Sequence, residues 1–380
     1  MSKAYEYVQK LAEEIGPRGS CTPEEKRAGD YIQDQFTQMG LATRVETFKA
    51  VTSFSWAFGL LYLLFVIAAI IFPFNNQAAL GVALFALIAF YLESNTFPII
   101  TRVLPKRGSQ NIIADLPARS KTIRRVVVMA HYDSSRSALS FSPQMVKGFR
   151  RSYLMMVGSM ALITLVYVVG VWSGMNPRIF WYISLPPAIY LFFAFLLLAH
   201  RELTGVYTPG GNDNASGVSV LLEVGRVLAH LPLLTTSVTL LATGAEESGT
   251  NGALDYLRKN RPPQDTYFIN LDNLGIGKVS VITAEGILGT KPSVPELVSA
   301  ARTVAQEKGL EVDFRPYSLL TTDGTVTLMR KYPTMGVMAF DEEGLLPNWH
   351  WPTDRAEYVQ PANLETSKEL VLGVLRKLES

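Results

Sequence analysis

Five short stretches of the chain combine histidine with acidic residues, side chains that can bind metal ions or transfer protons. They read AHYDS at 130–134, GGNDNASG at 210–217, GAEESG at 244–249, NLDNLG at 270–275 and WHWPTD at 349–354. Together they hold two imidazoles, several carboxylates and no thiol. Oxygen ligands with a few nitrogens suit zinc, and manganese or cobalt can replace it. The chemistry to be expected is therefore that of a metal site.

The elements around these stretches predict how they come together. Apolar or β-branched runs predict strands at 111–116, 125–130, 237–243, 266–271 and 335–340, and helical patterns occur at about 3–15, 23–39, 215–230, 249–260, 294–309 and 361–378. This alternation predicts an α/β fold with a mostly parallel central sheet flanked by helices. His131, Glu246 and Asp272 each follow a predicted strand. We therefore expect them at the carboxyl edge of the sheet, where such folds bind ligands.

The number of side chains matches a site for two metal ions. Two metals about 3.5–4 Å apart need one bridging carboxylate and two further ligands each. Asp213 as the bridge, His131 with Asp272, and Glu247 with His350 satisfy that count. Glu246 is then left beside the metals without a ligand role, which suits a general base. Asp133 can hold the imidazole of His131 or shape the turn at the bridge.

Taken in order, the five stretches resemble the co-catalytic zinc aminopeptidase family, which includes bacterial leucyl aminopeptidase and aminopeptidase Y. The segment LAEEIGPRGSCTPEEKRAGDYIQDQFTQMG at 11–40 also resembles the N-terminal helices of that family. The resemblance implies two Zn²⁺ ions per chain, the ligand roles given above and a peptide substrate. It also implies that Glu246 activates the attacking water. Action at the amino end of the peptide, rather than the carboxyl end, rests on the resemblance alone.

Two other functions stay open on this fold. One is a glutaminyl-cyclase-like acyl transfer with a single zinc, which metal stoichiometry would distinguish from a two-zinc hydrolase. The other is a non-catalytic binding or scaffold module, which would have lost metal ligands. Here all five ligand positions and the position of the base hold residues suited to these roles, which argues against a non-catalytic module. Tyr317 can stabilise an oxyanion, and Asp323 can lie near the substrate or cap a helix.

Two apolar stretches interrupt the motifs. Glu93 is the only charged residue from Ala50 to Thr101, and Arg178 is the only Asp, Glu, Lys or Arg from Ser152 to His200. A hydrocarbon core of about 30 Å needs roughly 20 apolar residues as helix. We predict four transmembrane helices, at Phe54–Phe72, Ala78–Leu92, Tyr153–Ser173 and Ile179–Ala199. They form two hairpins, residues 54–101 and 152–201, that contact the lipid bilayer.

Each hairpin returns the chain to the side of the membrane that it left. Residues 1–53, 102–151 and 202–380 can therefore form one zinc peptidase domain. Basic residues flank the spans on the side of this domain, namely Lys49, Arg102, Lys106, Arg107, Lys147, Arg150, Arg151 and Arg201. The opposite turns contribute only Arg178. This asymmetry predicts an integral membrane protein whose catalytic domain is cytoplasmic. Hairpins of this kind can also pack against copies of themselves, so a homo-oligomer is possible.

The composition excludes several classes of partner and site. The 35 basic and 33 acidic side chains nearly balance and form no long basic cluster, so no nucleic-acid partner is expected. The single cysteine, Cys21, excludes an internal disulfide framework and any multi-cysteine metal site. The start MSKAYEYVQKLAEEIG has no apolar core behind a basic end. We therefore expect an amphipathic helix there rather than a cleavable signal peptide.

Overall fold

The computed structural model describes residues 2–379 and divides into two compact units. The sheet unit comprises the chain up to Thr52, Lys106–Arg136 and the chain from Val206 onwards. The helical unit comprises Ser53–Pro105 and Ser137–Gly205. The helical unit thus consists of two insertions, each of which lies between two segments of the sheet unit.

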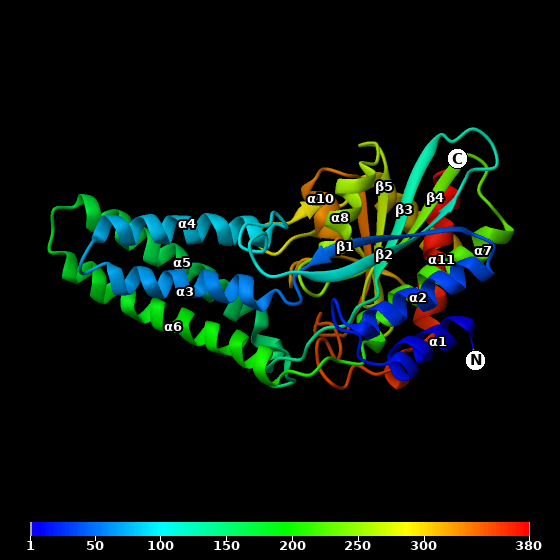
Figure 1. Cartoon of the computed structure of the whole chain (residues 1–380). Coiled ribbons are helices and arrows are strands. Elements are labelled where there is room, and N and C mark those ends of the chain that lie inside the picture. The colour runs from blue at the N-terminus through cyan, green and yellow to red at the C-terminus, as the bar shows by residue number, and fades with distance from the viewer. Residues whose placement is uncertain (1, 380) are drawn as a thin grey trace. The chain divides into compact units, whose positions relative to one another are not determined.

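The sheet unit is built on nine strands in the order β1-β2-β4-β3-β5-β9-β6-β7, with β8 beside β6 (Figure 1). Their bounds are β1 Ala42–Ala50, β2 Arg107–Leu116, β3 Arg124–His131, β4 Thr236–Thr243, β5 Tyr267–Leu271, β6 Lys278–Glu285, β7 Lys291–Pro292, β8 Asp313–Tyr317 and β9 Thr334–Phe340. The central strands β4, β3, β5 and β9 are parallel. On either side, β2 joins β4 and β6 joins β9 in antiparallel fashion.

The sheet is therefore mixed, and the expectation of a mostly parallel sheet is wrong. The strands that the sequence did not predict are β1, β6, β7 and β8, all on the outer parts of the sheet. In β1 the side chains are largely exposed or half-buried, so the strand carries no continuous apolar run. Apolar runs mark strands that are covered on both faces. A polar edge strand such as β1 therefore cannot be recognised from apolar runs in the sequence.

Helices cover both faces of the sheet. Their bounds are α1 Lys3–Gln9, η1 Lys10–Ile15, α2 Pro23–Gln38, η4 Gly211–Ser216, α7 Gly217–His230, α8 Asn251–Asn260, α9 Pro295–Lys308, α10 Asp323–Met329, η5 Ala356–Tyr358 and α11 Pro361–Lys377. On one face α1, α2, α7, α9 and α11 share a core with Val126 and Val128 of β3, and on the other α8 and α10 share a core with Val127 and Met129. Alternate residues of β3 thus serve opposite faces.

The helical unit is a bundle of four apolar helices. They are α3 Ser55–Ile71, α4 Asn76–Ser94, α5 Phe149–Trp172 and α6 Pro177–Thr204, with the short turns η2 Leu139–Phe141 and η3 Val146–Gly148 before α5. Three of them, α4, α5 and α6, are long and apolar enough to be candidate membrane spans. The fourth predicted span, α3, has 17 residues and falls below that length.

Contacts between the two hairpins join them into one bundle. The indole Nε1 of Trp181 in α6 donates to the carbonyl of Ala69 in α3 at 2.9 Å. The rings of Phe72 and Tyr167 stack with centroids 4.2 Å apart. Within the second hairpin, Tyr167 donates its hydroxyl hydrogen to Ser184 Oγ at 3.1 Å. Such polar contacts between helices are favoured where no water competes for them.

Both insertions begin and end where chain segments of the sheet unit already lie side by side. Ala50 at the end of β1 pairs with Arg107 at the start of β2. Arg136 forms an isolated bridge with Tyr207, and Thr208 donates its N–H to the carbonyl of Ser135 at 2.8 Å. Each insertion therefore occupies the place of a short connection.

A buried arginine joins the ends of the two insertions within the helical unit. Arg201, near the end of α6, is 2% exposed, and its Nη1 donates to Ser53 Oγ and Ser55 Oγ, both at 3.0 Å. The same nitrogen lies 2.9 Å from Glu202 Oε1. The guanidinium also lies 4.5 Å from the ring centroid of Phe54.

We predict that Arg201→Ala lowers the free energy of unfolding by about 3 kcal/mol, because it removes a buried guanidinium that contacts Ser53, Ser55 and Glu202. The thermal midpoint of the detergent-purified protein measures this loss. Arg178→Ala, an exposed change in the first turn of α6, is the control and should change stability by less than about 0.5 kcal/mol. Equal midpoints for the two variants would contradict the role given to Arg201.

Candidate metal centre

The predicted ligands lie at one edge of the sheet. His131 is the last residue of β3, Asp272 directly follows β5, and Asp213 lies in the η4 turn that leads into α7. Glu247 follows β4, and His350 lies in the long connection after β9. All five are buried. The parallel central strands end at this edge, which is why segments far apart in sequence meet there.

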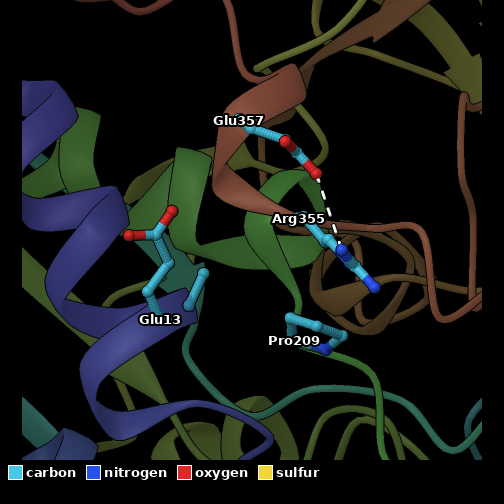
Figure 2. A pocket seen from close by; sticks show the side chains of 5 residues that line it. Glu13, Pro209, Arg355 and Glu357 are labelled. Carbon is cyan, nitrogen blue, oxygen red and sulfur yellow. Dashed lines mark ion pairs between the residues drawn. The ribbon is translucent and has the colours of Figure 1, made fainter.

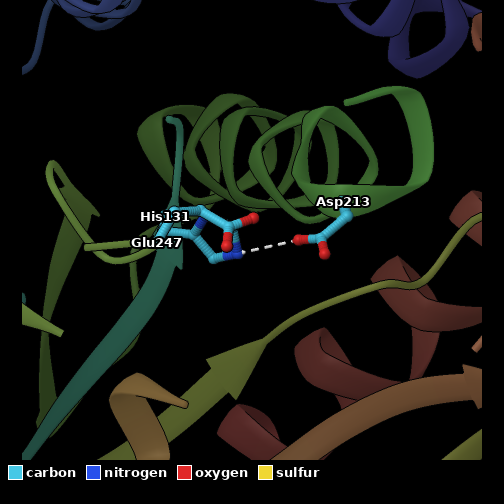
Figure 3. A group of neighbouring side chains, drawn as sticks. All are labelled: His131, Asp213 and Glu247. Carbon is cyan, nitrogen blue, oxygen red and sulfur yellow. Dashed lines mark ion pairs between the residues drawn. The ribbon is translucent and has the colours of Figure 1, made fainter. Parts of the chain in front are cut away.

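The carboxylate of Asp213 lies between two imidazoles. Its Oδ1 is 3.1 Å from His131 Nε2, and its Oδ2 is 3.2 Å from His350 Nε2. Asp272 Oδ1 lies 3.7 Å from His131 Nε2, while Glu247 Oε2 lies 3.1 Å from His350 Nε2. Figure 3 shows His131, Asp213 and Glu247 turned toward one another. The side chains therefore form two groups that share Asp213.

In these groups the buried carboxylates outnumber the imidazoles. Burial raises the pKa of Glu246 well above its usual range, and the nearby His131 offsets only part of this effect. Burial lowers the pKa of His350, but Glu247 and Asp213 outweigh it and bring that pKa to about 9. Buried carboxylates are costly unless cations or donors satisfy them. The site thus has an excess of buried negative charge.

A divalent cation with nitrogen and oxygen ligands fits this arrangement. His131, Asp213 and Glu247 each offer a ligand atom, and these atoms lie within 4.8 Å of one another. Within residues 2–379, Glu247 Oε1 is a buried oxygen without a hydrogen-bond partner. Imidazole and carboxylate ligands without thiolates suit zinc. The donor set therefore supports the expectation of a metal centre.

Asp133 organises the loop that carries both glutamates. Its Oδ1 accepts the N–H of Glu246 and its Oδ2 the N–H of Glu247, both at 3.1 Å. Ser20 donates its hydroxyl hydrogen to the same Oδ2 at 2.6 Å. The imidazole Nδ1 of His131 lies 3.2 Å from the main-chain carbonyl oxygen of Asp133 and 3.6 Å from its Oδ1. Asp133 therefore contacts the ligand His131 and the glutamate loop at once.

Two residues that the sequence reasoning missed hold Asp213 in place. The carboxylate of Asp354 accepts the N–H of Asn212 at 2.6 Å and that of Asp213 at 3.0 Å. Arg18 is fully buried; its Nε donates to the carbonyl of Tyr132 at 2.6 Å and its Nη2 to that of Gly210 at 2.7 Å. Arg18 thus joins the end of β3 to the turn before Asp213. Asp354 lies in the stretch WHWPTD and Arg18 in the segment GPRGS at 16–20, but these stretches do not show which groups the two side chains bind.

Asp323 and Tyr317 both lie close to the ligands. The N-cap of α10 is Thr322, so the alternative that Asp323 caps this helix is wrong by one residue. Asp323 instead accepts a hydrogen bond from Thr243 Oγ1, and burial raises its pKa to about 7. Burial, together with the nearby charge of Asp272, raises the pKa of Tyr317 well above its usual value.

A surface pocket of the sheet unit lies apart from these ligands. It is lined by Ala12, Glu13, Pro209, Arg355 and Glu357 (Figure 2). Arg355 Nη1 lies 3.7 Å from Glu357 Oε1, so the cation in this pocket already faces an acid. None of the predicted ligands lines it. We assign no ligand to this pocket.

Comparison with known proteins shows similarity to metallopeptidases. A family model described as peptidase family M28 matches residues 193–375. Aminopeptidase YwaD of Bacillus subtilis is 29% identical over 181 residues, which cover 44% of this chain and 38% of that protein. The chain thus aligns with well under half of this relative.

Solved structures show the same fold at low sequence identity. The zinc aminopeptidase BSAP of Bacillus subtilis has a TM-score of 0.58 and 16% identity, with 99% of this chain and 94% of that chain covered. A glutaminyl cyclase of Bacteroides thetaiotaomicron, bound to N-acetylhistamine, has a TM-score of 0.60 and 16% identity, with 98% and 96% covered. Residues 193–375 thus match the model of peptidase family M28, and the resemblance of the chain to the co-catalytic zinc aminopeptidases is confirmed.

Proposed function

We propose that this chain is a two-zinc metallopeptidase that removes residues from the amino end of peptides. The observation that carries the proposal is the position of the Asp213 carboxylate, with one oxygen beside each imidazole. His131 and Asp272 would hold one zinc, and His350 and Glu247 the other. Asp213 would bridge the two ions, which is the arrangement that a two-metal hydrolase needs.

The zinc ions, when bound, would polarise the scissile carbonyl and make the attacking water more acidic. Glu246 would take the proton from that water and pass it to the leaving amine. Its carboxylate is buried, and the charges of the proposed ligands His131, Glu247 and Asp272 act on it. Burial raises the pKa of Glu246, which makes its carboxylate a stronger proton acceptor and suits a general base.

We further propose that the helical unit anchors the enzyme in a lipid bilayer, with all four helices crossing it and the sheet unit in the cytoplasm. The candidate spans α4, α5 and α6 support the anchoring. The basic residues next to the spans support the orientation. At about 1.5 Å per residue, the 17 residues of α3 reach about 25 Å, close to the thickness of the hydrocarbon core.

We predict that Glu246→Gln retains zinc but lowers kcat by about 10²–10⁴, because the amide cannot take the proton. Hydrolysis of aminoacyl-fluorophore substrates with and without chelator, together with zinc analysis, measures both effects. Glu311→Gln, an exposed change of the same type, is the control. Full turnover by a zinc-loaded Glu246→Gln enzyme would refute the base. One zinc per chain, with cyclisation of glutaminyl peptides, would favour the acyl-transfer alternative.

We predict that zinc affinity rises from pH 6 to pH 8. Glu247 and Asp213 raise the pKa of His350 to about 9, and neighbouring carboxylates also raise the pKa of His131 well above its usual value. In the metal-free protein both imidazoles therefore carry protons at these pH values, which zinc must displace. One displaced proton makes the affinity rise about tenfold per pH unit. Competition with a chelator of known affinity measures the slope. A slope of zero would contradict the ligand roles of His131 and His350.

We predict that in intact cells a membrane-impermeant thiol reagent labels Ser173→Cys and does not label Ser120→Cys. Ser173 lies in the turn between α5 and α6, whereas Ser120 is an exposed residue of the sheet unit. Both variants would be built on Cys21→Ser, so that each protein has one thiol. Lysed cells are the control, in which both should react. Labelling of Ser120→Cys in intact cells would overturn the orientation.

A further inference from the structure

The loop between β4 and α8 is held by side chains from other parts of the sheet unit. Gly244 donates its N–H to Asn111 Oδ1 at 3.2 Å, and Ala245 donates to Glu25 Oε1 at 2.7 Å. The next two N–H groups, of Glu246 and Glu247, go to Asp133. Four successive main-chain donors thus depend on three side chains, because buried N–H groups must find acceptors.

Glu25 divides its carboxylate between this loop and the start of α2. Its Oε2 accepts the N–H of Cys21 at 2.8 Å, as the third residue of a capped helix commonly accepts an N–H near the cap. Its Oε1 accepts from Ala245, and also from Ser109 Oγ at 3.0 Å. The cap itself is Thr22, whose Oγ1 accepts the N–H of Glu25 at 3.2 Å. Glu25 is 2% exposed, so water cannot replace these contacts.

The residue that Glu25 holds has an unfavourable backbone conformation. Ala245 is fully buried and has φ of +49°, in the left-handed region that residues other than glycine rarely adopt. Such a conformation costs on the order of 1 kcal/mol or more and persists only where the surroundings enforce it. Glu246 and Glu247 follow immediately. A rotation of the peptide at Ala245 would therefore move both glutamates.

We propose that Glu25 is a positioning residue for the glutamate loop. It acts through the main-chain N–H of Ala245 to fix the direction of the Glu246 and Glu247 side chains. The inference rests on the proposed function, because it assigns the loop to the base and to one ligand. Glu25 itself lies outside the segment that matches the family model. The competing explanation is that Glu25 only caps α2.

Three variants of the full-length protein separate the two explanations. Glu25→Ala removes the contacts to Cys21, Ala245 and Ser109, whereas Glu25→Gln keeps an amide oxygen that can still accept from Ala245. Thr22→Ala removes the helix cap and the hydrogen bond from Thr22 Oγ1 to the carbonyl of Gly19, but leaves Glu25 in place. Glu24→Gln is the matched control, an adjacent acid in the first turn of α2. For each variant we would measure kcat, KM, zinc content, the thermal midpoint, and hydrogen exchange of the peptides covering 21–26 and 244–248 in metal-free protein.

We expect Glu25→Ala to lower kcat about 10–100-fold with KM changed less than about threefold, as for other residues that orient metal-site groups. Exchange should quicken at 244–248 in the absence of zinc. Glu25→Gln should recover most of kcat. Thr22→Ala should lower the midpoint and quicken exchange at 21–26, with kcat unchanged. Glu24→Gln should match the wild type.

The proposal is overturned if 244–248 stays protected in Glu25→Ala, or if kcat follows the thermal midpoint across the series. If Glu25→Ala does not fold, the test rests on Glu25→Gln. In that variant any change in kcat must be accompanied by a matching change in the hydrogen-exchange protection of residues 244–248. Failure of the proposed function looks different. In that case the wild-type protein would show no zinc-dependent hydrolysis, while the exchange measurements would still test the contact between Glu25 and the loop.

Discussion

The site depends on one buried carboxylate that faces two imidazoles. Asp213 approaches His131 with one oxygen and His350 with the other. The imidazoles come from segments more than 200 residues apart, so the turn at Asp213 must be placed accurately with respect to both. Asp354 binds two successive N–H groups of this turn, and Arg18 binds the carbonyl just before it. Two buried charged side chains, Asp354 and Arg18, thus hold the turn that carries Asp213.

Contacts at the ends of the two long insertions explain how the fold tolerates them. The ends of the first insertion are paired residues of neighbouring strands, and the ends of the second are held together by main-chain hydrogen bonds. Closing a longer loop costs only a little more entropy when its ends are already fixed. Arg18 binds the carbonyls of Tyr132 and Gly210, which flank the second insertion in sequence. The predicted ligands His131 and Asp213 can therefore keep their separation although 81 residues lie between them.

Side-chain contacts join the two hairpins of the helical unit at both of their ends. Trp181, Phe72 and Tyr167 join the two hairpins near their connecting turns, while Arg201 joins their other ends to Ser53 and Ser55. Large apolar side chains such as Ile70, Leu165 and Phe193 remain exposed on its surface. An apolar surface of this extent calls for an apolar environment. The two insertions, distant in sequence, thus build one structure.

The sequence by itself determined the ligand types, their order and the central strands that carry them. Apolar runs identify β3, β4, β5 and β9 because these strands are covered on both faces. Polar peripheral strands such as β1, and the short helix α10, carry no such signal. The edge strand β1 could not be predicted for this reason, whereas its antiparallel neighbour β2, which is largely buried, was predicted at 111–116.

Only the tertiary structure decided which residues hold the ligands. Arg18, Glu25 and Asp354 lie within or beside recognisable motifs, yet their partners are 114, 220 and 141 residues away. These contacts are made largely to main-chain N–H and C=O groups, which every residue except proline offers alike. A sequence therefore specifies which side chains can bind a metal. The path of the folded backbone specifies which side chains hold them in place, because it alone brings a particular peptide group within hydrogen-bonding distance.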